Sequence, residues 1–338
     1  MEEIKKFLKN ISLFCIIGIL LAFIIIANIT FIYNQCLKSF YLNNRITTVV
    51  LGDSHTQCAI DDSLFENIVN LSSNSEVYFY NFNKLKAIIQ RNHLIKTVII
   101  GCSYHSFSSD FNDEALFDTE ITDYTYPLYF LALDNESKMF LIKNNLAGVI
   151  FSFRKIMNTA IVSLFNYNSS KIFFNGIGKM VLPSIFRNKS MFSFWSGFYG
   201  SKKNNINDST IAIAIKSHYF KNDNTLRQYS HLQVYYLNRI INYCIEKNVR
   251  IFILMTPLND KFYSKIPAQF ISHYYSTLNN LKIKKNVIVL DYHDYQLPDE
   301  CFGDGDHLNK KGADNFTYFL NRTLMSAGIS KPNGNSLH

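Results

Sequence analysis

Apolar and polar positions fall into blocks along the chain, and five short apolar runs stand out. The runs are rich in β-branched and aliphatic residues and stop at glycine, proline or short polar side chains. They cover residues 48–51, 67–71, 97–101, 249–257 and 286–291. Continuous runs of this kind are typical of strands that helices bury on both faces. We therefore expect a five-stranded, mainly parallel sheet.

Segments with helical spacing separate these runs. A short helix is expected over residues 56–66, and another carries Tyr80 and the apolar positions that follow it. Longer helical patterns cover residues 225–247 and 310–325. Strands that alternate with helices predict βαβ units with right-handed crossovers. The fold class expected from the pattern is therefore α/β.

The longest uncharged segment covers residues 11–33. At about 1.5 Å per residue, a helix of this length crosses a hydrocarbon core of roughly 30 Å, which predicts a transmembrane helix. Lys5, Lys6 and Lys9 precede it, so the N-terminus is expected in the cytoplasm and the later chain in the periplasm or outside the cell. A cleaved signal peptide is the alternative, but no small-x-small cleavage site follows, so we favour an uncleaved signal anchor.

The alternation of strands and helices stops over residues 110–224. This segment is rich in Tyr and Phe and is interrupted by Asn- and Ser-rich breaks, which predicts an insertion. It divides one sheet domain into residues 34–109 and 225–330. Residues 1–10 are expected as a cytoplasmic N-terminus and residues 331–338 as a disordered tail.

Charge is concentrated in part of this chain. The net charge is +8 overall, but residues 151–230 alone carry +9, from eleven Lys or Arg against Asp208 and Asp223. A basic segment with Phe, Ile and Trp195 fits an anionic membrane surface or an acidic glycan. An ordinary solvated face of a basic protein explains it equally well. Nucleic acid is not expected, because the predicted topology places the segment outside the cytoplasm.

Composition excludes two classes of protein. With 29 Phe, 21 Tyr and only 18% charged residues, the chain of 338 residues is not intrinsically disordered. Its six cysteines form no CxxC pair and no paired spacing, so we expect neither a zinc site nor a dense disulfide framework.

The strongest chemical signal is the corner Gly52-Asp53-Ser54-His55 at the end of the first strand. Gly52 permits a sharp turn, and Asp53 and Ser54 are residue types that begin helices. The corner is either a helix cap or the place where Ser54 acts as a nucleophile, because open α/β sheets bind ligands at the carboxyl ends of their strands. His55 is most simply a local hydrogen-bonding residue.

Polar corners also follow the second and third strands. Ser72, Ser73 and Asn74 can cap the next helix, and the same turn can aim backbone N–H groups at an oxyanion. Ser103 and His105 follow the third strand and are further candidate donors at this sheet edge.

The fifth strand is followed by Asp304-Gly305-Asp306-His307. Residues three apart approach each other in a tight turn, so Asp304 can accept from His307 and leave the far ring nitrogen for a serine. A base held in this way can activate a hydroxyl nucleophile. A lone His307 is more often a surface residue, but the serine corner at the same edge favours a catalytic pair. Asp306 is the weaker alternative to Asp304.

These motifs resemble the SGNH or GDSL-like hydrolase superfamily. The corner at Ser54 is similar to its nucleophile motif, and the run from Asp304 to Asn309 is similar to its terminal Asp-x-x-His motif. The envelope branch is closest, which includes membrane-anchored proteins of teichoic acid D-alanylation and acetyltransferases of alginate and peptidoglycan. The resemblance does not cover the insertion. It implies a three-layer α/β/α sandwich with Ser54 as nucleophile, His307 as base and Asp304 as its orienting residue.

One motif departs from the superfamily. Its typical hydrolases carry Gly-x-Asn-Asp after the third strand, with the Asn donating to the oxyanion, whereas this chain has Gly101-Cys102-Ser103-Tyr104-His105. Ser103 or His105 replaces that donor, or backbone N–H groups of Ser54 and of the Ser72-Ser73 turn serve alone. The loss of one donor typically costs about 10²–10³ in rate, which favours a specialised acyltransferase or an inactive relative.

The sequence therefore predicts a membrane-anchored serine acyl-esterase or O-acyltransferase that acts on cell-envelope polysaccharide through an acyl-Ser54 intermediate, with no metal or cofactor. Its expected partners are an envelope glycan or acylated saccharide and the membrane. A transferase also needs a membrane-embedded partner that transports the acyl group. The rival hypothesis is a catalytically inactive protein of the same fold that binds or helps to assemble envelope glycan.

Overall fold

The computed structural model describes residues 2–38, 40–109, 116–117, 126, 129–130, 133–165, 197–284 and 286–330. Its sheet consists of β1 (Thr48–Leu51), β2 (Ile68–Asn70), β3 (Thr97–Gly101), β4 (Arg250–Met255) and β5 (Val287–Asp291). The strands lie in the order β2-β1-β3-β4-β5, and every neighbouring pair is parallel. The predicted α/β fold with five strands is confirmed.

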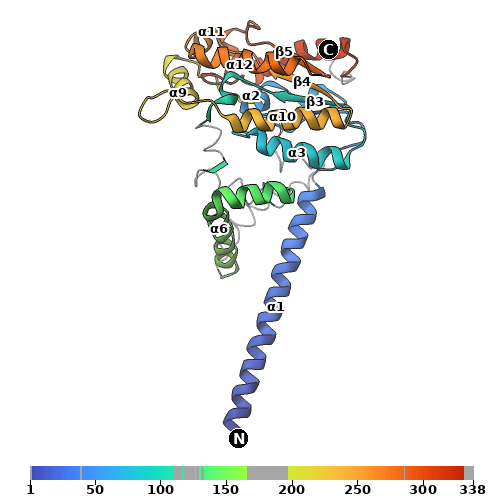
Figure 1. Ribbon diagram of the computed structural model, residues 1–338, viewed down its shortest axis with the longest axis vertical. Helices are drawn as coiled ribbons and strands as arrows, with labels where there is room; N and C mark the ends of the chain where they lie inside the picture. Colours follow the sequence, from blue (N-terminus) through green and yellow to red (C-terminus); the bar gives the residue numbers. More distant parts are fainter. Residues whose placement is uncertain are drawn as a thin grey trace.

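Helices connect these strands and extend beyond them (Figure 1). The described α-helices are α1 (Glu2–Lys38), α2 (Ser54–Ala59), α3 (Tyr78–Arg91), α6 (Asn135–Phe165), α9 (Asp208–Tyr219), α10 (His231–Glu246), α11 (Asp260–Tyr263), α12 (Ala268–Lys282) and α13 (Lys310–Ser326). Short 3-10 helices are η1 (Asp62–Leu64), η2 (Tyr104–Phe107) and η4 (Asp299–Cys301).

β1 to β4 bury side chains on both faces of the sheet, and the edge strand β5 is only partly covered. Val49 and Leu51 of β1 belong to a large core with residues of α3, α10 and α12, whereas Val50 belongs to a second core with residues of α13. Ile99 and Ile100 of β3 divide in the same way. Alternate strand residues point to opposite faces, so helices must cover both. This explains why the strands read as unbroken apolar runs.

The order of the strands places a site between β1 and β3. From β1 the chain crosses to β2 at one edge, and β3 then returns to the other side of β1. Connections on opposite sides leave a crevice at the carboxyl ends of β1 and β3, where open α/β sheets bind ligands. The Ser54 corner follows β1, and the segment with Ser103 and His105 follows β3.

Two helices begin or end where the pattern did not predict. The helix expected over 56–66 ends at Ala59, because the carboxylate of Asp61 accepts from the N–H of Ser63 and begins a separate 3-10 turn. The helix expected over 225–247 begins later, at α10, because the Ser230 hydroxyl caps it. A polar residue inside an apolar pattern is therefore a better guide to helix ends than the pattern itself.

The N-terminal helix and α6 lie outside the layers around the sheet. α1 extends away from the α/β domain, and α6 lies on the same side of it (Figure 1). Among the residues that the structure describes, no helix is both long and apolar enough to cross a membrane. The backbone of the predicted span over 11–33 lies within α1, but the side chains of residues 21–38 lie outside the described part. Residues 166–196 of the predicted insertion and the predicted tail over 331–338 also lie outside it.

Candidate active site

The corner after β1 caps α2 through Asp53 and does not use the Ser54 hydroxyl for the cap. Asp53 is the N-cap of α2, and its carboxylate accepts from the His55 N–H at 3.0 Å. Gly52 has φ +151°, and a Cβ there would lie 2.4 Å from the Thr56 hydroxyl. Glycine is therefore required both for the backbone conformation and for the close packing of α2. Because Asp53 provides the cap, the Ser54 hydroxyl is available for another contact.

That contact is with His307, which lies in the loop between η4 and α13. Ser54 Oγ lies 2.8 Å from His307 Nε2. The Nδ1 of the same ring lies 3.0 Å from Asp304 Oδ1 and 3.1 Å from its Oδ2. The structure thus brings together the three residues that the sequence assigns to a catalytic triad. Asp304 Oδ1 also accepts from the His307 N–H at 2.9 Å, as expected for a tight turn.

Asp306 reaches the same imidazole and has a larger set of contacts than the sequence suggested. Its Oδ1 lies 3.1 Å from His307 Nδ1. Its Oδ2 lies 3.1 Å from His55 Nε2 and 2.6 Å from His218 Nε2. The Asp306 side chain is only 4% exposed. His55 is therefore not a local hydrogen-bonding residue, because it contacts a loop 251 positions away in the sequence.

These contacts determine the charge of His307. Burial alone would lower the pKa of His307, but Asp306 and Asp304 outweigh burial and raise it well above the ordinary value of 6.5. Burial alone would raise the pKa of Asp306, but the three imidazoles around it lower it well below 3.8. The pKa of Asp304 is lowered as well, because its hydrogen bond to His307 outweighs its partial burial. Both carboxylates therefore favour the imidazolium form of His307.

A second histidine–carboxylate pair lies behind this one. His105 Nε2 lies 2.9 Å from Asp53 Oδ2, and both groups are largely buried. Burial, His218 and His55 lower the pKa of His105 to about 3 against the effect of Asp53. His105 is therefore neutral near pH 7, and its Nε2–H donates to Asp53.

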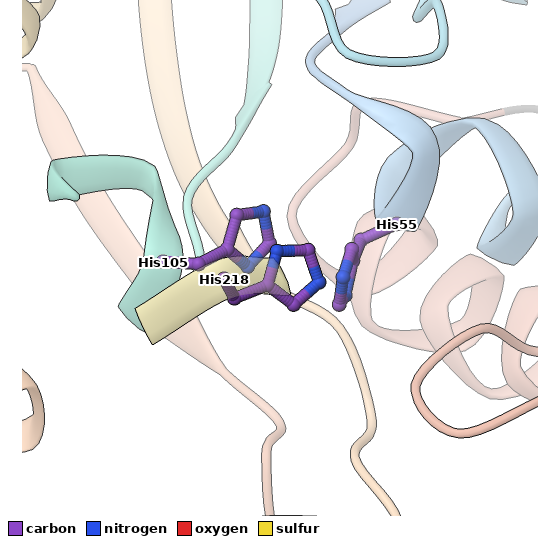
Figure 2. A group of neighbouring side chains, drawn as sticks. All are labelled: His55, His105 and His218. Carbon is purple, nitrogen blue, oxygen red and sulfur yellow. The ribbon is translucent and has the colours of Figure 1, made fainter. Parts of the chain in front are cut away.

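Three imidazoles form a cluster in this part of the structure, and one of them, His105, belongs to the second pair. Figure 2 shows His55, His105 and His218 side by side. Their ring nitrogens lie within 4.8 Å of one another, as do ligand atoms of His55, Asp306 and His307. A metal ion binds the lone pair in the plane of an imidazole ring. The rings of His105 and His218 stack with an angle of 18° and centroids 4.2 Å apart, so their in-plane lone pairs do not converge.

Hydrogen bonds oppose a metal at this cluster as well. The Nε2 atoms of His55 and His218 already contact Asp306, and that of His105 contacts Asp53. An ion bound by these Nε2 atoms would have to replace the bonds, and an ion held by all three imidazoles would also have to separate the stacked rings of His105 and His218. We therefore assign the cluster to hydrogen bonding and not to metal binding.

Ser54 and His307 open on a pocket of about 310 Å³. Asn74 lines it from the turn after β2, and Thr210 and Ser217 line it from α9. Hydroxyl and amide groups are frequent in this lining, and neither Lys nor Arg occurs among the described residues that form it. Asp304 and Asp306 also line it, so the pocket disfavours an anion and suits a neutral, hydroxylated molecule.

The structure separates the other predicted donors from this pocket. The Ser72 N–H donates to Asn70 Oδ1 at 3.0 Å, and the Ser73 N–H donates to the Gly52 carbonyl at 3.1 Å. Both groups are thus committed to the fold, which argues against the prediction that they serve an oxyanion. Ser103 caps η2 and His105 faces Asp53, and neither lines the pocket.

Sequence reasoning missed His218 because α9 lay inside the predicted insertion. A signal was present, since Ile211, Ala214, Ile215 and His218 follow helical spacing and are all buried in the structure. A histidine on the inner stripe of a helix needs a buried partner, and here it is Asp306. The predicted domain boundary at residue 225 therefore assigns α9, which lines the pocket, to the insertion and separates it from the rest of the site.

Comparisons with known proteins add little to this geometry. An uncharacterised protein family matches residues 210–327, which begin in α9 and end after α13. The matched part contains His218, Asp304, Asp306 and His307 but not Ser54. No curated protein matches the chain significantly. These findings name no activity.

Proposed function

We propose that this protein is a serine-dependent acyl-esterase or O-acyltransferase in which Ser54 forms an acyl-enzyme. The observation that carries the proposal is the continuous contact from Ser54 Oγ through His307 to Asp304, at 2.8 and 3.0 Å. These distances are within hydrogen-bond reach for a nucleophile, its base and the residue that orients the base. The sheet edge at which they meet is the usual ligand-binding edge of the fold class.

The reaction would follow from these contacts. Neutral His307 accepts the proton of Ser54 Oγ as that oxygen bonds to the carbonyl carbon of an ester. The imidazolium then gives the proton to the leaving alcohol as the ester C–O bond breaks, which leaves acyl-Ser54. In the second half, His307 takes a proton from water or from a sugar hydroxyl as that oxygen bonds to the acyl carbon. The imidazolium then returns the proton to Ser54 Oγ as the bond between the acyl group and Ser54 breaks.

Two groups are placed to stabilise the oxyanion. Ser54 is the first residue of α2, so its N–H has no carbonyl acceptor within the helix. Asn74 lines the same pocket and supplies an amide. We infer that these two donors replace the asparagine that is missing after the third strand, and that Ser72, Ser73, Ser103 and His105 do not.

The pocket and the N-terminal helix suggest the setting of the reaction. Hydroxyl and amide groups next to Ser54, in a lining with two carboxylates and without Lys or Arg among its described residues, suit a neutral saccharide as acyl donor or acceptor. We further propose an SGNH-like α/β/α sandwich anchored in the cytoplasmic membrane by residues 11–33, with the sheet domain outside the cytoplasm. Protease added to intact cells with a permeable outer envelope should digest the domain. Digestion only after the cytoplasmic membrane is broken would refute this topology.

The enzyme proposal is tested by covalent labelling of Ser54. A fluorophosphonate probe should label the full-length protein, and Ser54→Ala should abolish labelling. Ser264→Ala is a matched control, because Ser264 is exposed and its hydroxyl donates to the local carbonyl of Lys261. No labelling of the wild type, or equal labelling of Ser54→Ala, would refute the proposal.

One observation favours the inactive alternative, a protein of this fold that binds or helps to assemble envelope glycan. The two carboxylates that contact His307 favour its protonated form, and a protonated imidazole cannot accept the proton of Ser54. Absence of labelling even at alkaline pH, together with saturable binding of an envelope glycan, would support this alternative.

A further inference from the structure

Two carboxylates reach Nδ1 of His307, and they differ in exposure to solvent. Asp304 Oδ1 lies 3.0 Å and Asp306 Oδ1 lies 3.1 Å from this nitrogen. The Asp304 side chain is 48% exposed, whereas that of Asp306 is 4% exposed. Water screens an exposed charge and leaves a buried one strong. At equal distance, Asp306 therefore has the larger electrostatic effect on His307.

The remaining contacts of the two carboxylates also differ. Asp304 Oδ1 accepts from the backbone N–H groups of Asp306 and His307, so it shapes the turn. Asp306 Oδ2 contacts no backbone N–H among the described residues and lies instead against the imidazoles of His55 and His218. Asp304 is thus tied to its own loop, whereas Asp306 is held by two other elements, α2 and α9.

α9 touches this loop at a second place. A Cβ at Gly305 would lie 2.5 Å from the Thr210 carbonyl oxygen and 2.9 Å from Ile211 Cα. Only glycine allows the loop to lie against the helix backbone at this distance. The helix therefore fixes both the backbone of the loop, at Gly305, and the side chain of Asp306, through His218.

We propose that Asp306 is a second positioning residue for His307, and that His218 on α9 keeps Asp306 in place. The proposal rests on the proposed function of Ser54 and His307 and adds to it a control of the base by α9. The segment that lines the pocket with Thr210 and Ser217 thus also sets the state of the base. A movement of α9 would change both the pocket and His307.

Other ionisable groups around His307 do not replace Asp306. The cap and first turns of α2 contribute Asp53, His55 and Cys58, η2 contributes His105, and α9 contributes His218. Asp53 is paired with His105, and burial raises the pKa of the Cys58 thiol to about 11, so it is neutral. Of the described carboxylates, Asp304 and Asp306 are those that contact the imidazole of His307.

The test is a titration of His307 in the full-length protein in detergent micelles, with isotope-labelled histidine followed by NMR. The His307→Gln variant assigns the signal. An opposite charge at hydrogen-bond distance shifts a pKa by roughly one to three pH units. We therefore expect Asp306→Asn to lower the His307 midpoint by at least one such unit, and Asp304→Asn to lower it less. An unchanged midpoint in Asp306→Asn, or a larger effect of Asp304→Asn, would overturn the proposal.

A second pair of variants tests the network without altering Asp306, in case Asp306→Asn does not fold. His218→Ala removes the donor, and His218→Gln places an amide nitrogen near the position of Nε2. We expect His218→Ala to move the His307 midpoint toward its ordinary value and His218→Gln to restore it. Equal midpoints in wild type and His218→Ala would contradict the role of α9.

These measurements do not depend on catalysis, so the two proposals can fail separately. If the fluorophosphonate leaves Ser54 unlabelled while the variants shift His307 as expected, the enzyme proposal is wrong and the positioning network stands. If Ser54 is labelled but Asp306→Asn leaves the titration unchanged, the network is wrong and the enzyme proposal stands.

Discussion

His105 and His307 each contact a carboxylate, yet their surroundings favour opposite charges. His105 contacts Asp53, is wholly enclosed and has two imidazoles beside it, and its pKa falls to about 3. His307 contacts two carboxylates and borders the pocket, and its pKa rises well above 6.5. A carboxylate partner alone therefore does not define a general base. What distinguishes the two is the number of opposite charges in contact and the access to the pocket.

The largest expected effect separates the two histidines by their contribution to rate. General-base catalysis typically contributes about 10²–10⁴-fold, so His307→Gln should slow the labelling of Ser54 by a factor in this range. His105→Gln, which leaves the contact between Ser54 and His307 unchanged, should slow it less than tenfold. Rates of fluorophosphonate labelling in folded variants would measure this. Similar losses of rate in both variants would show that His307 and His105 do not differ in their contribution to the labelling of Ser54.

The two regions should also differ in the donors beside each histidine. Asn74 lines the pocket next to His307, and its replacement by Ala should reduce the labelling rate by about 10²-fold, the usual cost of one oxyanion donor. Ser103 caps η2, the helix that carries His105, and Ser103→Ala is the matched control. A greater loss in Ser103→Ala than in Asn74→Ala would indicate that the oxyanion donor follows the third strand, which is one of the alternatives that the sequence leaves open.

The pH dependence of labelling reads the charge of His307 directly. His307 has to lose a proton before it can act as a base, so the rate should rise with pH and reach half its maximum above pH 6.5. His105→Gln should keep the same midpoint, because His105 is neutral throughout this range. A midpoint at or below 6.5 would mean that the two carboxylates do not favour the imidazolium.

A smaller effect is expected in the pH dependence of stability, with opposite signs for the two histidines. The folded pKa of His105 lies below 6.5, so the unfolded chain takes up protons first and stability falls as pH drops from 6.5 toward 3. The folded pKa of His307 lies above 6.5, so its contribution is complete below pH 6.5 and is lost as pH rises through the folded pKa.

Thermal unfolding of the two glutamine variants measures these signs. His105→Gln should flatten the loss of stability on the acid side, and His307→Gln should flatten the loss on the alkaline side. The wild type provides both slopes as the reference. Two variants with parallel profiles would show that the two imidazoles do not differ in charge.

The sequence predicted the parts of this molecule that depend on local patterns. Buried strands leave unbroken apolar runs, so all five were found, and the spacing of Asp304 and His307 within one turn made their contact predictable. The corner at Ser54 could be located because glycine and a helix-starting residue end the first run. In each case the evidence lies within a few neighbouring positions.

The parts that were missed depend on packing between distant elements. Asp306 ranked below Asp304 because spacing in a turn says nothing about burial, and burial is what makes its charge effective. His218 was overlooked because nothing near it in sequence shows that α9 rests on a loop about ninety positions later, which the contact at Gly305 requires. The Ser72-Ser73 turn was assigned free N–H groups that the fold uses elsewhere.

The packing of Thr56 determines which half of the site can be adjusted. A Cβ at Gly52 would lie 2.4 Å from the Thr56 hydroxyl, and one at Gly101 would lie 1.8 Å from it. The first turn of α2 is therefore seated on the ends of β1 and β3 without room for one methyl group, so Ser54 belongs to the rigid frame of the sheet. His307 reaches that frame through side-chain hydrogen bonds. Substitutions in the histidine loop can thus change the contact with Ser54 while the frame stays in place, whereas substitutions beneath the serine would displace the frame itself.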